Sequence, residues 1–357
     1  MNRNAYSLGE FLTSFFLENK IVNMKIVVRA PNWIGDSVLA LPCLESLQHN
    51  FAQAEIWIAA RKWVKDVFAG HDLVTGIIQL PEKVDINSLI STAKELQQAN
   101  FDLGLLLTNS FSSALLFYLA RIPRRWGYHT DGRRFLLTKG IPAPDKRPPY
   151  HQLYYYLNLL DGLGLEILPP KLKFPLSAEE KQRAKELLGQ LQIDCHTPLI
   201  IIHPGAAYGS AKRWPPTRYA QLTLLFQQRQ KASILITGSE ADNQVAEAIC
   251  SLVSPKPLNL SGKTDLRLLA ALISQADLFI SNDSGPMHIA NALQVPVVAI
   301  FGPTIPQQTG PFQPPSVIIK KEVPCWPCLY RECPFDHRCL TTVSAEEVYQ
   351  ASLNFLS

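Results

Sequence analysis

Short apolar runs recur along the chain, and each is followed by a loop of small or polar residues and then by a helix-like pattern. Residues 26–28 (Ile-Val-Val) form the first run, and residues 199–202 (Leu-Ile-Ile-Ile) open a second series with the same order. This alternation predicts βαβ units and parallel sheets. Further strands are expected at residues 55–59, 77–80, 103–107, 233–237, 278–281 and 297–301.

Two such series in 357 residues suit two domains of about 150 residues each. Helices are expected at residues 37–47 and 177–191, and a proline-containing stretch at 168–176 predicts the linker. The predicted fold class is α/β with two Rossmann-like domains. The expected divisions are an N-terminal domain at 24–170, a C-terminal domain at 177–343, a C-terminal helix at 344–357 and a leader of unknown role at 1–23.

Composition narrows the class of protein. Hydrophobic residues make up 47% and charged residues 18%, which indicates a folded protein. A net charge of +4 is too small to indicate nucleic acid as a partner. The most apolar window, 101–120, is interrupted by polar residues, and residues 1–23 lack a signal-peptide pattern. We therefore expect a cytoplasmic protein with mostly reduced cysteines.

Local charge is more informative than net charge. Residues 121–147 contain eight Lys or Arg and two Asp or Glu, a local excess of +6. Such a run is usually a solvated basic face, and the alternative is a binding surface for an anionic partner.

The loop after the first strand contains Gly35 and Asp36, directly before a predicted helix. Ligands of open parallel sheets bind beyond the carboxyl ends of the strands, so this position favours a functional role. Asp36 has two interpretations: it caps the helix, which is the commoner role of such a residue, or it is a general base in an interdomain cleft.

Three further loops follow strands of the second series. The loop at 203–215 combines small residues, including Gly205, with Lys212 and a proline-led helix start, a pattern that suits phosphate binding. Residues 281–290 combine Asp283, Ser284 and Gly285 with a helix start, where free N–H groups attract anions. His288 taken alone is more simply a packed helix residue. Residues 301–304 form another strand end with a Gly-Pro turn.

Several motifs are absent from the sequence. No G-x-G-x-x-G follows the first strand, and no P-loop motif occurs, which weakens dehydrogenase and NTPase hypotheses. No Asp-x-Asp pair is available to hold Mg²⁺ on a sugar nucleotide. Cys325, Cys328, Cys333 and Cys339 are spaced as zinc or iron–sulfur ligands could be, although a loop of reduced thiols is the favoured interpretation.

Together, these loops resemble glycosyltransferase family 9, the bacterial heptosyltransferases of GT-B fold, in which two Rossmann-like domains face each other across a cleft. The resemblance extends over most of residues 24–357. Features at 122–128, 131–133, 151–156 and 325–339 resemble the ADP-heptose:lipopolysaccharide heptosyltransferase II type. The segments that carry the family resemblance are 29–42, 203–215, 281–293 and 301–304.

The resemblance implies an inverting transfer of L-glycero-D-manno-heptose from ADP-heptose to the inner core of lipopolysaccharide, without a metal cofactor. The acceptor would be a Kdo/heptose-lipid A, reached peripherally at the cytoplasmic face of the inner membrane. Asp36 would be the base and Lys212 would contact the diphosphate. The remaining implied donor-binding residues are Gly205, Glu240, Asp283, Ser284, Gly285 and His288, and the expected acceptor contacts are Arg124, Arg125, Arg133 and Arg134.

Two alternatives stay open at this point. A sugar-nucleotide epimerase or hydrolase would share the two-domain architecture and would need no acceptor. A non-enzymatic nucleotide-sugar-binding module would not depend on Asp36.

Overall fold

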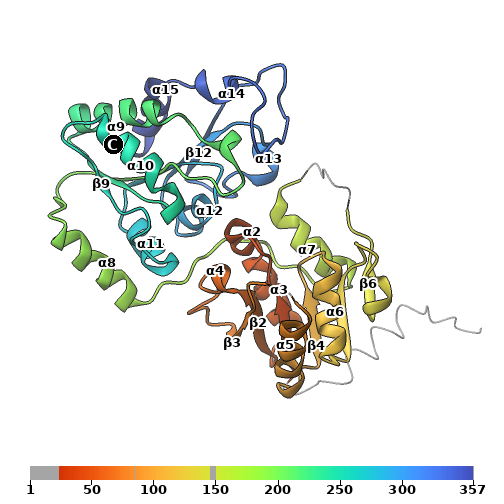
Figure 1. The fold of residues 1–357 in the computed structure, drawn as a ribbon. Helices are drawn as coiled ribbons and strands as arrows, with labels where there is room; N and C mark the ends of the chain where they lie inside the picture. The colour runs from red at the N-terminus through yellow and green to blue at the C-terminus, as the bar shows by residue number, and fades with distance from the viewer. Residues whose placement is uncertain (1–23, 84, 145–149, 357) are drawn as a thin grey trace, which may run out of the picture.

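Two parallel six-stranded sheets, each covered by helices on both faces, form the protein (Figure 1). The computed structural model describes residues 24–83, 85–144 and 150–356. None of the described helices is long and apolar enough to cross a membrane. The predicted α/β class with two Rossmann-like domains is confirmed.

The first sheet has the strand order β3-β2-β1-β4-β5-β6, and every described pair in it is parallel. Strand β1, in the middle of this sheet, is apolar on both faces. Helices cover both faces, so Ile26, Val27 and Val28 are fully buried. The strands are β1 (Lys25–Arg29), β2 (Glu55–Arg61), β3 (Val74–Leu80), β4 (Leu103–Leu106), β5 (Arg124–Tyr128) and β6 (Lys139–Ile141). The helices are α2 (Ile34–Leu39), α3 (Leu41–Asn50), α4 (Lys62–Lys65), α5 (Ile86–Gln98), α6 (Phe111–Leu119), η1 (Arg134–Leu136) and α7 (Gln152–Gly162).

The second sheet has the order β12-β11-β10-β7-β8-β9, and the C-terminal helix α15 packs against α9 beside it. The strands are β7 (Leu199–His203), β8 (Ser233–Ile236), β9 (Leu258–Asn259), β10 (Leu278–Asn282), β11 (Val297–Phe301) and β12 (Ser316–Lys320). The helices are α8 (Ala178–Gln190), η2 (Ser210–Lys212), α9 (Pro216–Gln230), η3 (Glu240–Asp242), α10 (Asn243–Ser251), α11 (Leu266–Ile273), α12 (Gly285–Ala292), α13 (Pro306–Thr309), α14 (Arg338–Thr341), α15 (Ala345–Ser352) and η4 (Leu353–Phe355).

The single helix expected at 37–47 is wrong. The structure has two helices there, α2 and α3, which meet at Ala40. Pro42 lies in the first turn of α3, and proline has no N–H for the bond that would continue α2. The break limits α2 to residues Ile34–Leu39, and the first turn of this short helix faces the second domain.

Helices α2 and α12 bring the two domains into close contact. A Cβ atom at Gly35 would lie 2.9 Å from Cδ2 of His288, and one at Gly285 would lie 3.0 Å from Cβ of Ile34. Both positions are therefore occupied by the residue that lets two helices approach this closely. The contact fixes the distance between the loops that follow β1 and β10.

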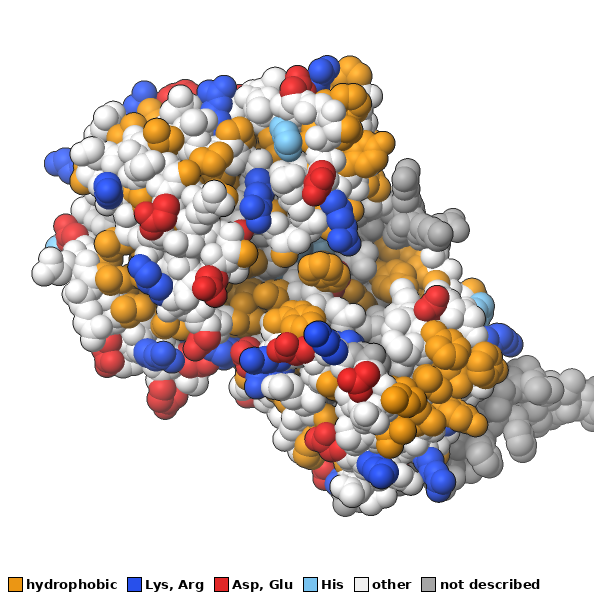
Figure 2. Space-filling view, viewed as in Figure 1, with side chains coloured by type: hydrophobic (Ala, Val, Ile, Leu, Met, Phe, Trp, Pro, Cys, Tyr) orange, Lys and Arg blue, Asp and Glu red, His pale blue; other side chains and the backbone are white. Residues whose placement is uncertain are grey.

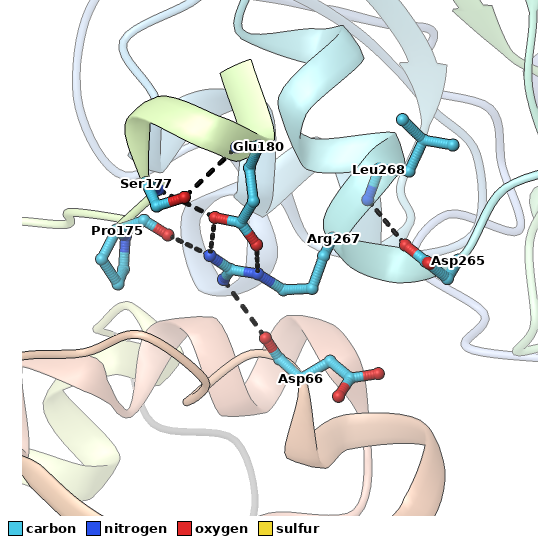
Figure 3. A network of polar contacts seen from close by, with 7 residues as sticks. All are labelled: Asp66, Pro175, Ser177, Glu180, Asp265, Arg267 and Leu268. Atoms are coloured by element: carbon cyan, nitrogen blue, oxygen red, sulfur yellow. Dashed lines mark hydrogen bonds and ion pairs between the residues drawn. The ribbon is translucent and has the colours of Figure 1, made fainter. Parts of the chain in front are cut away.

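A second interdomain contact lies at the linker, the segment 163–177 between α7 and α8 (Figure 3). Arg267 of α11 binds both carboxylate oxygens of Glu180 at 2.7 Å and donates to the carbonyl of Pro175 at 2.7 Å. Its guanidinium also reaches the carbonyl of Asp66 in the first domain at 3.4 Å. Its guanidinium carbon lies 5.0 Å from the centre of the Phe174 ring. One side chain thus joins both domains and the linker.

We expect Arg267→Met to lower the free energy of unfolding by about 1.5–3 kcal/mol, the worth of hydrogen bonds from a charged group. Trypsin or proteinase K should also cut the linker faster, which mass spectrometry of the fragments would measure. Arg229→Met is the matched control, because the Arg229–Glu346 pair is half exposed and lies within one domain. Equal rates of linker cleavage in the two variants would show that Arg267 does not hold the linker in place.

Candidate active site

Asp36 lies at the carboxyl end of β1, in the first turn of α2. It does not cap that helix: the N-cap residue is Trp33, which provides no side-chain hydrogen bond, and the Tyr156 hydroxyl donates to the Asp36 carboxylate. Burial raises the pKa of Asp36 to about 6, although the Tyr156 bond and the charge of Lys212 oppose the rise. The carboxyl remains half-buried, so it can still meet a ligand.

A cavity of about 560 Å³ opens in front of Asp36. The loops after β1 and β4 and the helix α7 supply most of the lining residues. The lining suits a polar ligand with several hydroxyl groups, because it combines amides, hydroxyls and aromatic rings. The polar and aromatic lining residues are Asn32, Trp33, Thr108, Asn109, Ser110, Thr130, Gln152, Tyr155 and Tyr156.

Lys212 and Asp283 form a buried ion pair on the opposite side of the cleft, with Nζ 2.5 Å from Oδ2. The same carboxylate oxygen accepts hydrogen bonds from Oγ1 of Thr304 at 2.7 Å and of Thr309 at 3.4 Å. The ammonium also lies 4.8 Å from the centre of the Tyr208 ring. Three donors thus converge on Oδ2 of Asp283, and this carboxylate fixes the position of the lysine.

The start of α12 lies beside this pair. Ser284 is its N-cap residue and makes no side-chain cap, and its buried Oγ has no hydrogen-bond partner among the described residues. Gly285 follows, and its N–H is one of the free groups at a helix start. His288 is buried against Gly35, and burial lowers the pKa of its imidazole to about 4, so the ring is neutral. Its Nδ1 likewise has no partner in the described part of the chain.

Gly205 and Glu240 lie at the carboxyl ends of β7 and β8. A Cβ atom at Gly205 would lie 2.5 Å from the Oδ2 atom of Asp242, so the loop can pass this carboxylate only as glycine. Asp242 in turn pairs with Arg213 at 3.1 Å. Glu240 is exposed at the start of η3, where its carboxyl is open to a ligand.

Three of the four expected acceptor arginines are not placed to touch a ligand in the cavity. Arg124 and Arg125 open β5, so they lie at the amino ends of the parallel strands, whereas Asp36 lies beyond the carboxyl ends. Arg125 also donates to two backbone carbonyls. Arg133 is completely buried and donates to the carbonyls of Tyr128 and Thr108. Burial and position therefore correct this expectation for these three.

Arg134 is exposed at the start of η1, which follows the carboxyl end of β5. It stays a prediction as a contact for an anion. Lys146 and Arg147, the last basic residues of the +6 segment, lie outside the described residues.

The cysteine-rich segment packs beside the donor side of the cleft. The carbonyl of Leu329 accepts from the Tyr208 hydroxyl at 2.9 Å, and the carbonyl of Arg331 accepts from the N–H of Ala211. All seven cysteines are free thiols. Among the described residues, the one group whose possible metal-ligand atoms all lie within 4.8 Å of one another is Asp194, Cys195 and His196, and all three are exposed.

Sequence reasoning missed three residues of this site. Tyr156 binds Asp36 from α7, Thr304 binds Asp283, and Asp242 fills the space beside Gly205. Thr304 had a signal, because it follows the strand expected at 297–301. Tyr156 lies inside α7 and Asp242 is the last residue of η3, and the pattern of the chain does not indicate which helical side chain faces a cleft.

A carboxyl with a raised pKa on one domain faces a buried lysine and a helix start on the other, which is an arrangement that suits group transfer. The sequence profile of glycosyltransferase family 9 (heptosyltransferase) matches residues 89–338. The chain belongs to this family.

Relatives within the family cover nearly the whole chain. Lipooligosaccharide heptosyltransferase 2 of Campylobacter jejuni is 30% identical over 93% of this chain and 98% of the relative. Lipopolysaccharide heptosyltransferase 2 of Escherichia coli is 29% identical over 83% of this chain and 88% of its own length. The structure of E. coli ADP-heptose lps heptosyltransferase II matches with a TM-score of 0.81 and 27% identity, covering 93% and 98% of the two chains.

We expect Tyr156→Phe to move the acidic limb of the pH profile of this glycosyltransferase to higher pH. A base must be deprotonated, so kcat/KM should rise with pH through the Asp36 pKa of about 6. The Tyr156 bond lowers that pKa, and its loss raises it. Tyr155→Phe is the control, because the Tyr155 hydroxyl is bonded to Asn109 instead. An acidic limb at the same pH in both variants would show that the Tyr156 hydroxyl does not lower the pKa of Asp36.

Proposed function

We propose that this member of glycosyltransferase family 9 transfers L-glycero-D-manno-heptose from ADP-heptose to the inner core of lipopolysaccharide, with inversion, as a second-heptose transferase. Support comes from heptosyltransferase 2 relatives that align with most of the chain. The observation that carries the proposal is Asp36 in a polar cavity opposite the Lys212–Asp283 pair.

Asp36 is the general base. An acceptor hydroxyl attacks the anomeric carbon, the bond from that carbon to the diphosphate oxygen breaks, and ADP leaves with the electron pair. The hydroxyl proton passes to the Asp36 carboxylate. A pKa near 6 suits this work, because the carboxylate is ionised at neutral pH yet basic enough to accept a proton.

The donor diphosphate lies against Lys212 and the start of α12. Negative charge grows on the diphosphate as the bond breaks, and a fixed ammonium and free N–H groups stabilise it without rearrangement. Asp283 acts on the lysine rather than on the phosphates, since a carboxylate close to phosphate oxygens would repel them. Ser284, Gly285 and Gly205 line the approach of the donor, and Glu240 receives the ribose.

The same groups make a metal unnecessary in this proposal, because Lys212 supplies the positive charge that a cation would supply in a carboxylate-held site. The acceptor is a Kdo/heptose-lipid A, whose sugars enter the cavity beside Asp36. Since its lipid stays in the bilayer, the enzyme works peripherally at the cytoplasmic face of the inner membrane.

An assay of ADP-heptose against core acceptors truncated at successive sugars tests the function. Heptose should appear on the acceptor that ends in the first inner-core heptose, and addition of a chelator should not change the rate. Consumption of ADP-heptose at the same rate without an acceptor would support an epimerase or hydrolase instead. Binding without turnover of any acceptor would support a non-enzymatic module.

Asp36→Asn should lower kcat by at least about 10², the low end of general acid–base contributions. Affinity for ADP-heptose, measured by calorimetry, should change little, because the donor phosphates lie on the other domain. Ser37→Ala is a control in the same helix, since the Ser37 side chain is buried and bonds to the Pro31 carbonyl. Near-normal turnover of Asp36→Asn would remove Asp36 from catalysis.

A further inference from the structure

Helix α6 exposes an apolar face. Phe111, Leu115, Tyr118 and Leu119 lie at helical spacing on one side, and the exposed fractions of Phe111, Tyr118 and Leu119 are 37%, 50% and 40%. Phe135 of η1 is 73% exposed, with its ring centre 6.0 Å from that of Phe111. Figure 2 shows the apolar side chains gathered over the part of the first domain that contains α6.

The exposed side of α6 differs in composition from that of an ordinary surface helix. The exposed positions of α8 are mostly Glu, Lys, Arg and Gln, whereas no exposed position of α6 has a charge. Single exposed apolar residues need no explanation, but a contiguous apolar face with a polar rim marks an interaction surface. We call Phe111, Leu115, Tyr118, Leu119 and Phe135 the α6 face.

Basic side chains lie at both ends of the α6 face. Arg121 is exposed just beyond the end of α6, and Arg134 is exposed next to Phe135. The guanidinium of Arg125 lies 5.4 Å from the centre of the Tyr118 ring. The one acidic residue between positions 111 and 139, Asp131, accepts the N–H of Phe111 at 2.8 Å. An apolar centre with a cationic rim is complementary to an anionic lipid surface.

The α6 face also begins where the cavity ends. Ser110 lines the cavity with Asp36, and the next residue, Phe111, opens the face. Because α6 starts at the carboxyl edge of the sheet, a surface that touches Phe111 and Phe135 lies beside the mouth of the cavity. A lipid-linked sugar could thus enter the cavity while its acyl chains stay in a bilayer.

We propose that the α6 face docks on an anionic lipid bilayer, with its aromatic and Leu side chains inserted among the acyl chains and with Arg121 and Arg134 at the headgroups. The inference deepens the proposed function, on which its choice of a lipid-linked acceptor rests. It also gives Arg134 a partner, namely lipid phosphates rather than acceptor sugars.

Vesicle sedimentation of the full chain tests the docking surface. The wild type should bind vesicles of equal parts phosphatidylglycerol and phosphatidylcholine, and bind pure phosphatidylcholine vesicles more weakly. Leu119→Gln with Phe135→Ser should lower the partition coefficient by about tenfold or more, from the apolar surface no longer buried. Arg134→Gln should lower it by about fivefold on the anionic vesicles alone.

The control makes the same chemical changes elsewhere. Leu252→Gln with Phe335→Ser replaces a leucine and a phenylalanine of similar exposure, 52% and 60%, in the second domain. This variant should bind as the wild type does. Equal binding of the two double variants, or no binding by the wild type, overturns the proposal.

Other occupants of the face give different results. A dimer that dissociates on Leu119→Gln with Phe135→Ser, measured by light scattering, would assign the face to a second copy and overturn the proposal. Vesicle binding that survives those changes and is lost on Phe15→Ser with Phe16→Ser would assign the membrane contact to residues 1–23.

Activity separates this inference from the proposed function. On a deacylated, soluble acceptor, the variant Leu119→Gln with Phe135→Ser should keep wild-type kcat and KM, because neither residue lines the cavity. A wild type that fails to transfer heptose to that acceptor, yet binds the vesicles through the α6 face, would contradict the proposed function alone.

Discussion

The close approach of α2 to α12 is the constraint on which the rest of the site depends. Gly35 and Gly285 leave no room for a side chain between the two helices, so the loops after β1 and β10 face each other. This contact places Asp36 within the electrostatic reach of Lys212 and Asp283, although Asp36 belongs to the first domain and the other two belong to the second. A larger residue at either glycine would move Asp36 away from that pair.

The three charges balance one another. Burial raises the pKa of Asp36 and the Asp283 carboxylate adds to the rise, while the Tyr156 hydroxyl and Lys212 favour the ionised form. The result is a carboxyl whose pKa of about 6 lies below neutral pH and above that of an ordinary aspartate. Asp283 has a double effect here, since it holds Lys212 in place and also raises the pKa of Asp36.

The sequence predicted the sites that follow strands and missed those that depend on packing. Asp36, Lys212 and Asp283 were predicted because parallel strands bring their carboxyl ends to one edge, where ligands bind. Tyr156 was missed because it reaches Asp36 from a helix that no local pattern links to the cleft. Arg133 was misjudged because its charge suggested exposure, whereas backbone carbonyls bind it in the interior.

Arg267 makes shorter hydrogen bonds to the linker and the second domain than to the first domain, and this difference affects how the domains can move. Its three short bonds, to Glu180 and Pro175, hold the end of the linker against the second domain, and only the 3.4 Å bond to Asp66 spans to the first. Of the bonds that Arg267 makes, rotation between the domains would break only the weak one to Asp66. The end of the linker is therefore tied to the second domain, and this arginine leaves the chain before Pro175 as the part that can bend.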